Sequence, residues 1–219
     1  MLDLADRMKD YEGRFRRHCL RRVPLIVRVD GRAFHTFTRK MEKPFDMRLS
    51  QAMEAAAKAV AKDMQGFRVC YIQSDEASFL LTDYSELNTG SWFDYCQNKV
   101  ESIAASLMTA HFNKELGTTA CFDARAFNVP KEDVANYFLW RAKDWHRNSI
   151  SMYAGAFFSH KQLMNKSIAN KHEMLHEIGK NWATDVSERF KNGVWFTKDG
   201  DAMVEPNYVS VSSLVDQYL

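Results

Sequence analysis

Apolar residues along this chain alternate between helical spacing and short continuous runs. Leu4, Met8, Tyr11 and Phe15 recur every three or four residues, which predicts an amphipathic helix over residues 2–17. The same spacing predicts helices from Leu49 to Met64 and over residues 92–114. Continuous apolar runs of strand length occupy residues 25–29, 67–72, 77–82 and 121–129.

The order of these elements indicates a fold class. The two runs at 67–72 and 77–82 are separated by only four polar residues, 73–76, which is typical of a hairpin. The chain from 1 to 130 therefore reads strand, helix, hairpin, helix, strand after its first helix. That order is the split arrangement of a ferredoxin-like α+β fold with an antiparallel sheet.

The remainder, residues 131–219, has a different pattern. Helical spacing predicts helices over 131–146, 149–160, 170–178 and about 183–190, and the sequence KDGD at 198–201 predicts the turn of a two-strand hairpin. No Pro/Gly/Ser-rich linker separates the two parts. We therefore expect a ferredoxin-like domain at 1–130 and a helical and β-hairpin appendage at 131–219 that packs on it.

Composition narrows the setting and the partners. The 219 residues are 46% hydrophobic, and 30 basic against 28 acidic residues give a net charge of +2. A nucleic-acid partner would therefore be bound by a local basic patch and not by the overall field. No run of about 18 apolar residues suggests a membrane span, and the first residues lack the apolar segment of a signal peptide. We expect a cytoplasmic protein without a membrane partner.

Candidate chemistry lies where two predicted strands end. Asp30 follows the strand 25–29, and Asp75 lies in the hairpin turn, so a ferredoxin-like sheet would bring both carboxylates to one edge. Two such carboxylates can share Mg²⁺ ions that hold a nucleoside triphosphate for in-line displacement. The amides of residues 31–35 could bind phosphate oxygens, and cations follow nearby. These cations are Arg28, Arg32, Arg39, Lys40 and Lys43. The alternative is that Asp30 caps a turn and that residues 74–76 form a solvated hairpin tip.

Three segments resemble one known family. VRVDGRAFHTFTRKMEKPFD, YIQSDEASF and FDARAFNVP are similar to the tRNA-histidine guanylyltransferase family, in particular its guanylyltransferase-like branch. The resemblance covers nearly the whole chain. It implies a palm related to those of polymerases and nucleotidyl cyclases, which extends RNA in the 3′-to-5′ direction with two Mg²⁺ ions, ATP and GTP or another nucleoside triphosphate.

The resemblance also implies roles for individual residues. Asp30 and Asp75, with Glu76 beside them, match the catalytic carboxylates, and the metal ligands would be Asp30, Asp75 and the carbonyl of Gly31. The nucleotide-binding residues implied in this way are Asp30, Gly31, Arg32, Ala33, Phe34, His35, Lys43, Asp46, Ser74, Asp75 and Lys99. Relatives assemble as dimers of dimers, so the resemblance implies a homotetramer that acts on tRNA.

One segment departs from the family pattern. The chain reads HRNSISM from His146 to Met152 where eukaryotic members read HINNLYN, so only His146 and Asn148 are retained as candidate RNA-binding residues. This favours templated repair of the tRNA 5′ end, with untemplated guanosine addition to histidine tRNA as the alternative. A histidine at the end of an amphipathic helix is also commonly structural. A nucleotidyl cyclase and a non-catalytic RNA-binding module remain further alternatives.

A separate motif points to another chemistry. HEMLH at 172–176 fits H-E-x-x-H, which on a helix sets His172 and His176 on one face around zinc with Glu173 as a base. No convincing third ligand follows at a suitable spacing. We therefore expect these histidines to face solvent or RNA instead of a metal.

Overall fold

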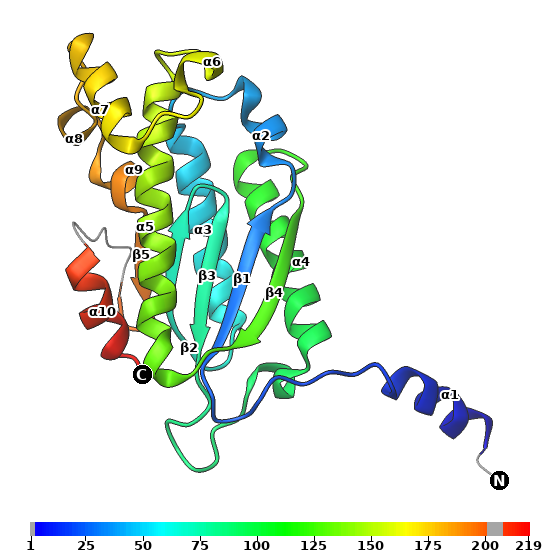
Figure 1. Ribbon diagram of the computed structural model, residues 1–219. Helices are drawn as coiled ribbons and strands as arrows, with labels where there is room; N and C mark the ends of the chain where they lie inside the picture. The colour runs from blue at the N-terminus through cyan, green and yellow to red at the C-terminus, as the bar shows by residue number, and fades with distance from the viewer. Residues whose placement is uncertain (1–2, 201–207) are drawn as a thin grey trace.

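The computed structural model describes residues 3–200 and 208–219, and at its centre lies a five-stranded antiparallel sheet (Figure 1). The strands lie side by side in the order β4-β1-β3-β2-β5, and every neighbouring pair is antiparallel. They are β1 (Leu25–Gly31), β2 (Phe67–Gln73), β3 (Glu76–Leu81), β4 (Phe122–Asn128) and β5 (Val194–Thr197). The first four have the ferredoxin-like order that the sequence predicted, so that prediction is confirmed.

Two helices cover one face of this sheet. Helices α3 (Met47–Asp63) and α4 (Gln97–Leu116) lie behind the strands in Figure 1. The carboxylate of Asp46 caps the first turn of α3, and Gly117 ends α4 with φ at 65°, a left-handed conformation that glycine adopts without strain. Alternate residues of β1, including Val27 and Val29, are fully buried against these helices.

The opposite face is covered by the C-terminal part of the chain. The long helix α5 (Lys131–Gly155) crosses the sheet in front of the strands, and α10 (Tyr208–Asp216) packs beside it (Figure 1). Buried side chains of this layer include Ile26 of β1 and Trp195 of β5. Helices α5 and α10 thus form the second hydrophobic layer on the sheet.

Helix α5 corrects one prediction. The sequence suggested a break between helices at 146 and 149, whereas the structure has a single helix of 25 residues. Ser149, at the predicted break, is buried; its hydroxyl donates to the Phe190 carbonyl at 2.6 Å and accepts from Trp182 Nε1 at 3.0 Å. Tertiary hydrogen bonds therefore allow a polar residue inside a continuous helix.

The helices beyond α5 form a small cluster at one end of the molecule. It contains α6 (His160–Leu163), α7 (Ile168–Glu177), α8 (Trp182–Asp185) and α9 (Glu188–Asn192). Their apolar residues pack on the last turns of α5 around Ile150 and Leu175. The predicted helix at 183–190 is therefore two short helices.

Only the first strand of the predicted hairpin around 198–201 lies within the described residues. β5 pairs with β2, with Val194 opposite Ile72 and Thr197 opposite Val69. The second strand of the predicted hairpin would lie in residues 201–207, outside the described residues. Helix α10 was not expected from the sequence.

The start of the chain is the most exposed element. None of the ten described residues of α1 (Leu4–Gly13) is buried, and Figure 1 shows this helix standing away from the sheet. Its apolar stripe therefore has no partner within the described part of the chain.

The predicted helix over 92–114 begins later, at Gln97, because Phe93, Asp94 and Tyr95 have positive φ angles in a short 3₁₀ segment, η2 (Trp92–Tyr95). Among the helices that the structure describes, none is long and apolar enough to cross a membrane.

Candidate active site

Asp30 and Asp75 come together at the end of β1. The two-residue turn of the β2–β3 hairpin, Ser74 and Asp75, lies against that end, and the Gly31 N–H donates to the Asp75 carbonyl at 3.1 Å. Asp30 lies opposite Glu76 on β3 and opposite Asp123 on β4, so these three side chains share one face. It is the face that α5 covers.

The surroundings of Asp30 and Asp75 disfavour the charged form of both carboxyl groups. Burial raises the pKa of Asp75 to about 6, although hydrogen bonds from Ser74 and from its own amide oppose this, and Asp30 and Glu76 raise it further. Burial also raises the pKa of Asp30, followed by repulsion from Glu76. Arg28 offsets part of this, since its guanidinium lies 3.8 Å from the Asp30 carboxylate. Negative charge here is incompletely balanced, which suits a site that receives cations.

The turn predicted to bind phosphate, residues 31–35, differs in part from expectation. The Gly31 and Arg32 amides already donate to the carbonyls of Asp75 and Cys121. Ala33 has φ at 56°, and α2 (Phe34–Phe37) starts directly after it. The prediction of five free amides over residues 31–35 is therefore wrong for the first two. The amides of 33–35 are those that can face an anion.

Side chains in this turn have separate tasks. Phe34 is buried against Phe112 and Phe122, whereas Arg32 and His35 are exposed. A Cβ added to Gly31 would lie 2.3 Å from the Phe34 ring, so only glycine lets the turn close over this ring.

Glu76 is held differently from the two aspartates. It is buried, and its carboxylate accepts from Arg141 Nε at 2.8 Å and from Arg141 Nη2 at 2.6 Å. Gln73 Nε2 also donates to it at 3.2 Å. Arg141 comes from the middle of α5, so this bidentate pair joins the palm sheet to the C-terminal helix.

A pocket lies beside the Ser74 turn. Its walls come from the loop 38–46, the start of α3, the end of β2 and the inner side of α5. Lys43 lines it and donates from Nζ to the Thr38 carbonyl at 3.0 Å. Asp46 also lines it, but its oxygens are occupied by the amides of Glu42, Arg48 and Leu49, and the Arg48 side chain lowers its pKa. Asp46 thereby fixes the shape of the loop that carries Lys43.

Lys99 lies away from Asp30 and Asp75. It lies near the start of α4, where its ammonium stands 5.5 Å from the centre of the Phe93 ring. Neighbouring backbone pairs with residues 17–19, ahead of β1, whereas Asp30 lies at the far end of that strand. The structure therefore places Lys99 away from Asp30 and Asp75, and its role in binding a nucleotide phosphate stays a prediction.

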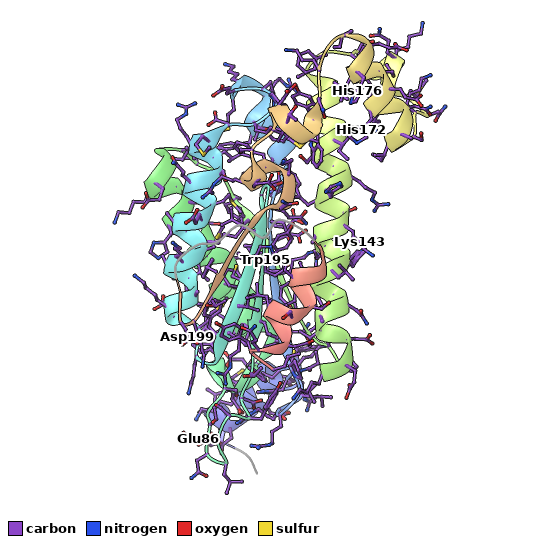
Figure 2. All side chains as sticks on the ribbon, turned by 90° about the vertical axis from the view of Figure 1, so that its left-hand side faces the viewer. Glu86, Lys143, His172, His176, Trp195 and Asp199 are labelled. Atoms are coloured by element: carbon purple, nitrogen blue, oxygen red, sulfur yellow. The ribbon has the colours of Figure 1, made fainter. Side chains whose placement is uncertain are left out.

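The candidate RNA-binding residues lie further along α5. His146 packs edge-on against Trp182, with ring centres 4.7 Å apart, and burial lowers its pKa. Asn148 is exposed and donates to Asp144 at 3.3 Å. On α7, the centre of the His172 ring lies 6.0 Å from the centre of the Trp182 ring, while His176 is exposed (Figure 2). Among the described residues, no group of three His, Cys, Asp or Glu side chains could hold a metal ion.

Three residues at the site were missed from the sequence: Asp123, Arg141 and Tyr137. Asp123 is the residue opposite Asp30, and the Tyr137 hydroxyl lies 2.8 Å from Ser78 Oγ. A signal for Arg141 was present, because it falls within the apolar stripe of Val134, Phe138 and Trp145. A charged residue at a core position of a helix indicates a buried ion pair.

The ferredoxin-like sheet, with two carboxylates at the end of β1 beside the turn 31–35, is the arrangement expected of a nucleotidyltransferase of the polymerase-palm class. Residues 5–130 match the family described as tRNAHis guanylyltransferase. The chain therefore belongs to the tRNA(His) guanylyltransferase family, as its sequence motifs indicated.

Individual relatives support the assignment to this family. The tRNA(His) guanylyltransferase of Schizosaccharomyces pombe is 30% identical over 199 residues, covering 81% of this chain and 74% of that protein. A bacterial tRNA(His) guanylyltransferase-like protein in complex with ATP superposes with a TM-score of 0.93 at 38% identity, over 99% of both chains. A bacterial like-protein in complex with GTP has a TM-score of 0.84 at 34% identity, again over 99% of both chains.

Proposed function

We propose that this protein adds nucleotides to the 5′ end of tRNA in the 3′-to-5′ direction and selects each nucleotide by pairing with the opposing base. The observation that carries the proposal is the meeting of Asp30 and Asp75 beside the amides of residues 33–35 and the pocket lined by Lys43. The ATP and GTP complexes of the bacterial like-proteins support nucleoside triphosphates as substrates.

The chemistry has two phosphoryl-transfer steps. In the first, an oxygen of the tRNA 5′-monophosphate attacks the α-phosphorus of ATP, and pyrophosphate leaves. In the second, the 3′-hydroxyl of an incoming nucleoside triphosphate attacks the activated 5′-phosphorus, and AMP leaves. Lys43 would balance phosphate charge, and the amides of residues 33–35 would orient phosphate oxygens for in-line attack.

The residues present fit Mg²⁺. Asp30, Asp75 and the carbonyl of Gly31 supply oxygen ligands, and Mg²⁺ sites in nucleotide enzymes combine one or two carboxylates with substrate phosphates. The raised pKa values of both aspartates support a site that favours added positive charge. When bound, two Mg²⁺ ions would stabilise charge on the triphosphate and lower the pKa of the attacking hydroxyl.

Templating is tested with one base change. A tRNA lacking its first nucleotide is incubated with Mg²⁺, ATP and all four nucleoside triphosphates, and the products are sequenced after the opposing base is varied. We expect the added nucleotide to complement that base in several tRNA species. The names of the curated relatives favour a second candidate, untemplated guanosine addition to histidine tRNA. Guanosine added whatever the opposing base would establish that candidate instead.

A tRNA partner would be bound by the C-terminal helices. Exposed cations on and after α5 include Lys143, Arg147, Lys161 and Lys166, and Figure 2 shows Lys143 on the outer side of that helix. Such scattered cations suit phosphates along a folded RNA. Arg147→Ala with Lys161→Ala should weaken tRNA binding and leave ATP binding unchanged.

We also propose that the protein assembles as a homotetramer. Leu4, Met8, Tyr11 and Phe15 are between 43% and 78% exposed, and a ten-residue helix has little stability without a partner. Burial of this stripe against another copy would stabilise it. Light scattering should give four chains per particle, and removal of residues 1–16 should give a smaller assembly. A monomeric full-length protein would contradict the proposal.

A further inference from the structure

Two residues that line the pocket beside the Ser74 turn each carry a buried polar atom without a hydrogen-bond partner among the described residues. Gln73 is 5% exposed and Trp145 is 4% exposed, and both side chains line this pocket. Among the described residues, neither Gln73 Oε1 nor Trp145 Nε1 has a hydrogen-bond partner. Buried polar atoms are nearly always paired, so a pocket that offers one free acceptor and one free donor is prepared for a ligand.

The orientation of the Gln73 amide follows from its other contact. Its Nε2 donates to Glu76 Oε1 at 3.2 Å, and the Glu76 carboxylate, paired with Arg141, can only accept. The carbonyl oxygen of Gln73 is therefore the atom left over, and it can accept an N–H group. Trp145 Nε1 can only donate. A matching ligand presents both a donor and an acceptor.

The remaining walls suit a flat ring. Phe45 and Phe190 line the pocket and stack on one another at 4.7 Å, and Phe45 meets the Trp145 ring edge-on at 6.5 Å. Ser74, next to Asp75, also lines the pocket, so a ring held there would lie close to the two aspartates. Apolar walls with a few placed polar groups are typical of a site for a nucleobase.

We propose that Gln73 and Trp145 recognise the adenine of the activating ATP. Gln73 Oε1 accepts from the exocyclic N6 amine, and Trp145 Nε1 donates to a ring nitrogen. This assignment rests on the proposed function, because it takes ATP as the substrate of the first step. The two residues are thus specificity determinants for the base and are distinct from the aspartates proposed to bind metal.

Calorimetry with three ligands tests the assignment. ATP, purine riboside 5′-triphosphate, which lacks the N6 amine, and inorganic tripolyphosphate are titrated with Mg²⁺ into the wild type and Gln73→Met. The wild type should bind ATP about threefold to tenfold more tightly than the analogue, and Gln73→Met should bind both equally. Tripolyphosphate should bind both proteins alike. Trp145→Phe should weaken ATP binding by a similar factor without affecting tripolyphosphate.

Ser78→Ala is the matched control, because Ser78 Oγ lies 3.4 Å from Glu76 Oε1 but does not line the pocket. It should retain the preference for ATP over the analogue. If Gln73→Met keeps that preference, or loses tripolyphosphate as strongly as ATP, the assignment is wrong even if templated addition occurs. If the wild type binds no ATP at all, the proposed function fails as well.

Discussion

Arg141 of α5 and Glu76 of β3 form a buried bidentate ion pair, with N···O distances of 2.6 and 2.8 Å. The pair lies beside Asp30, which is the cross-strand neighbour of Glu76 on β1. It fixes the C-terminal helix against the candidate active site. The charge of Glu76 is therefore balanced by a bidentate arginine. Asp30 has the more distant Arg28, 3.8 Å away.

Removal of one partner of this pair should be costly. Arg141→Met leaves a buried carboxylate unpaired and should lower the free energy of unfolding by about 3–5 kcal/mol. Urea denaturation measures the loss. The double variant with Glu76→Gln should regain much of it, since no buried charge remains; equal losses in the single and double variants would show that the pair contributes little.

Asp75→Asn separates stability from activity. Because the folded-state pKa of Asp75 is about 6, above its usual 3.8, the folded protein binds the proton more tightly than the unfolded chain does. Metal-free stability should therefore fall as pH rises from about 4 to 6 and stay low above that range. Asp75→Asn should remove this fall in stability with pH. The variant's free energy of unfolding should exceed that of the wild type by on the order of 2 kcal/mol at pH 7.5.

The same variant should lose both adenylylation and nucleotide addition, and Mg²⁺ should no longer raise its melting temperature. Thermal unfolding at pH 5 and 7.5, with and without Mg²⁺, and single-turnover assays measure these effects. Near-normal turnover would refute the palm site.

Lys43→Ala tests the division between the two steps. Lys43 lines the pocket beside the turn, and a flexible ammonium suits a triphosphate. The variant should weaken activation by ATP at least about tenfold, equivalent to one lost charged contact. It should have much less effect on extension of a tRNA that already carries a 5′-triphosphate. Equal losses on both substrates would contradict this role.

The two histidines of HEMLH should be dispensable. His172→Ala with His176→Ala should retain activity and metal dependence, because the His172 ring packs on Trp182 and His176 is exposed. Loss of about 1 kcal/mol of stability is expected from the ring contact. Collapse of activity together with loss of bound zinc, measured by elemental analysis, would instead support a zinc site.

The sequence by itself determined the palm and its two aspartates. Continuous apolar runs and helical spacing record which segments are buried, so the order of elements in residues 25–128 and the hairpin turn at Asp75 were predictable. The position of Asp30 at a strand end followed from the same local pattern. These features depend on neighbours that are close in the sequence.

Only the tertiary structure decided the contacts between distant segments. Arg141 reaches Glu76 across 65 positions, Ser149 is satisfied by residues more than 30 positions away, and β5 pairs with β2, a strand far away in the sequence. Lys99, although close in sequence to the palm motifs, lies beside η2, away from the end of β1 that carries Asp30. No local pattern encodes such pairings, because their free energy comes from burial and hydrogen bonds that exist only once the layers have assembled.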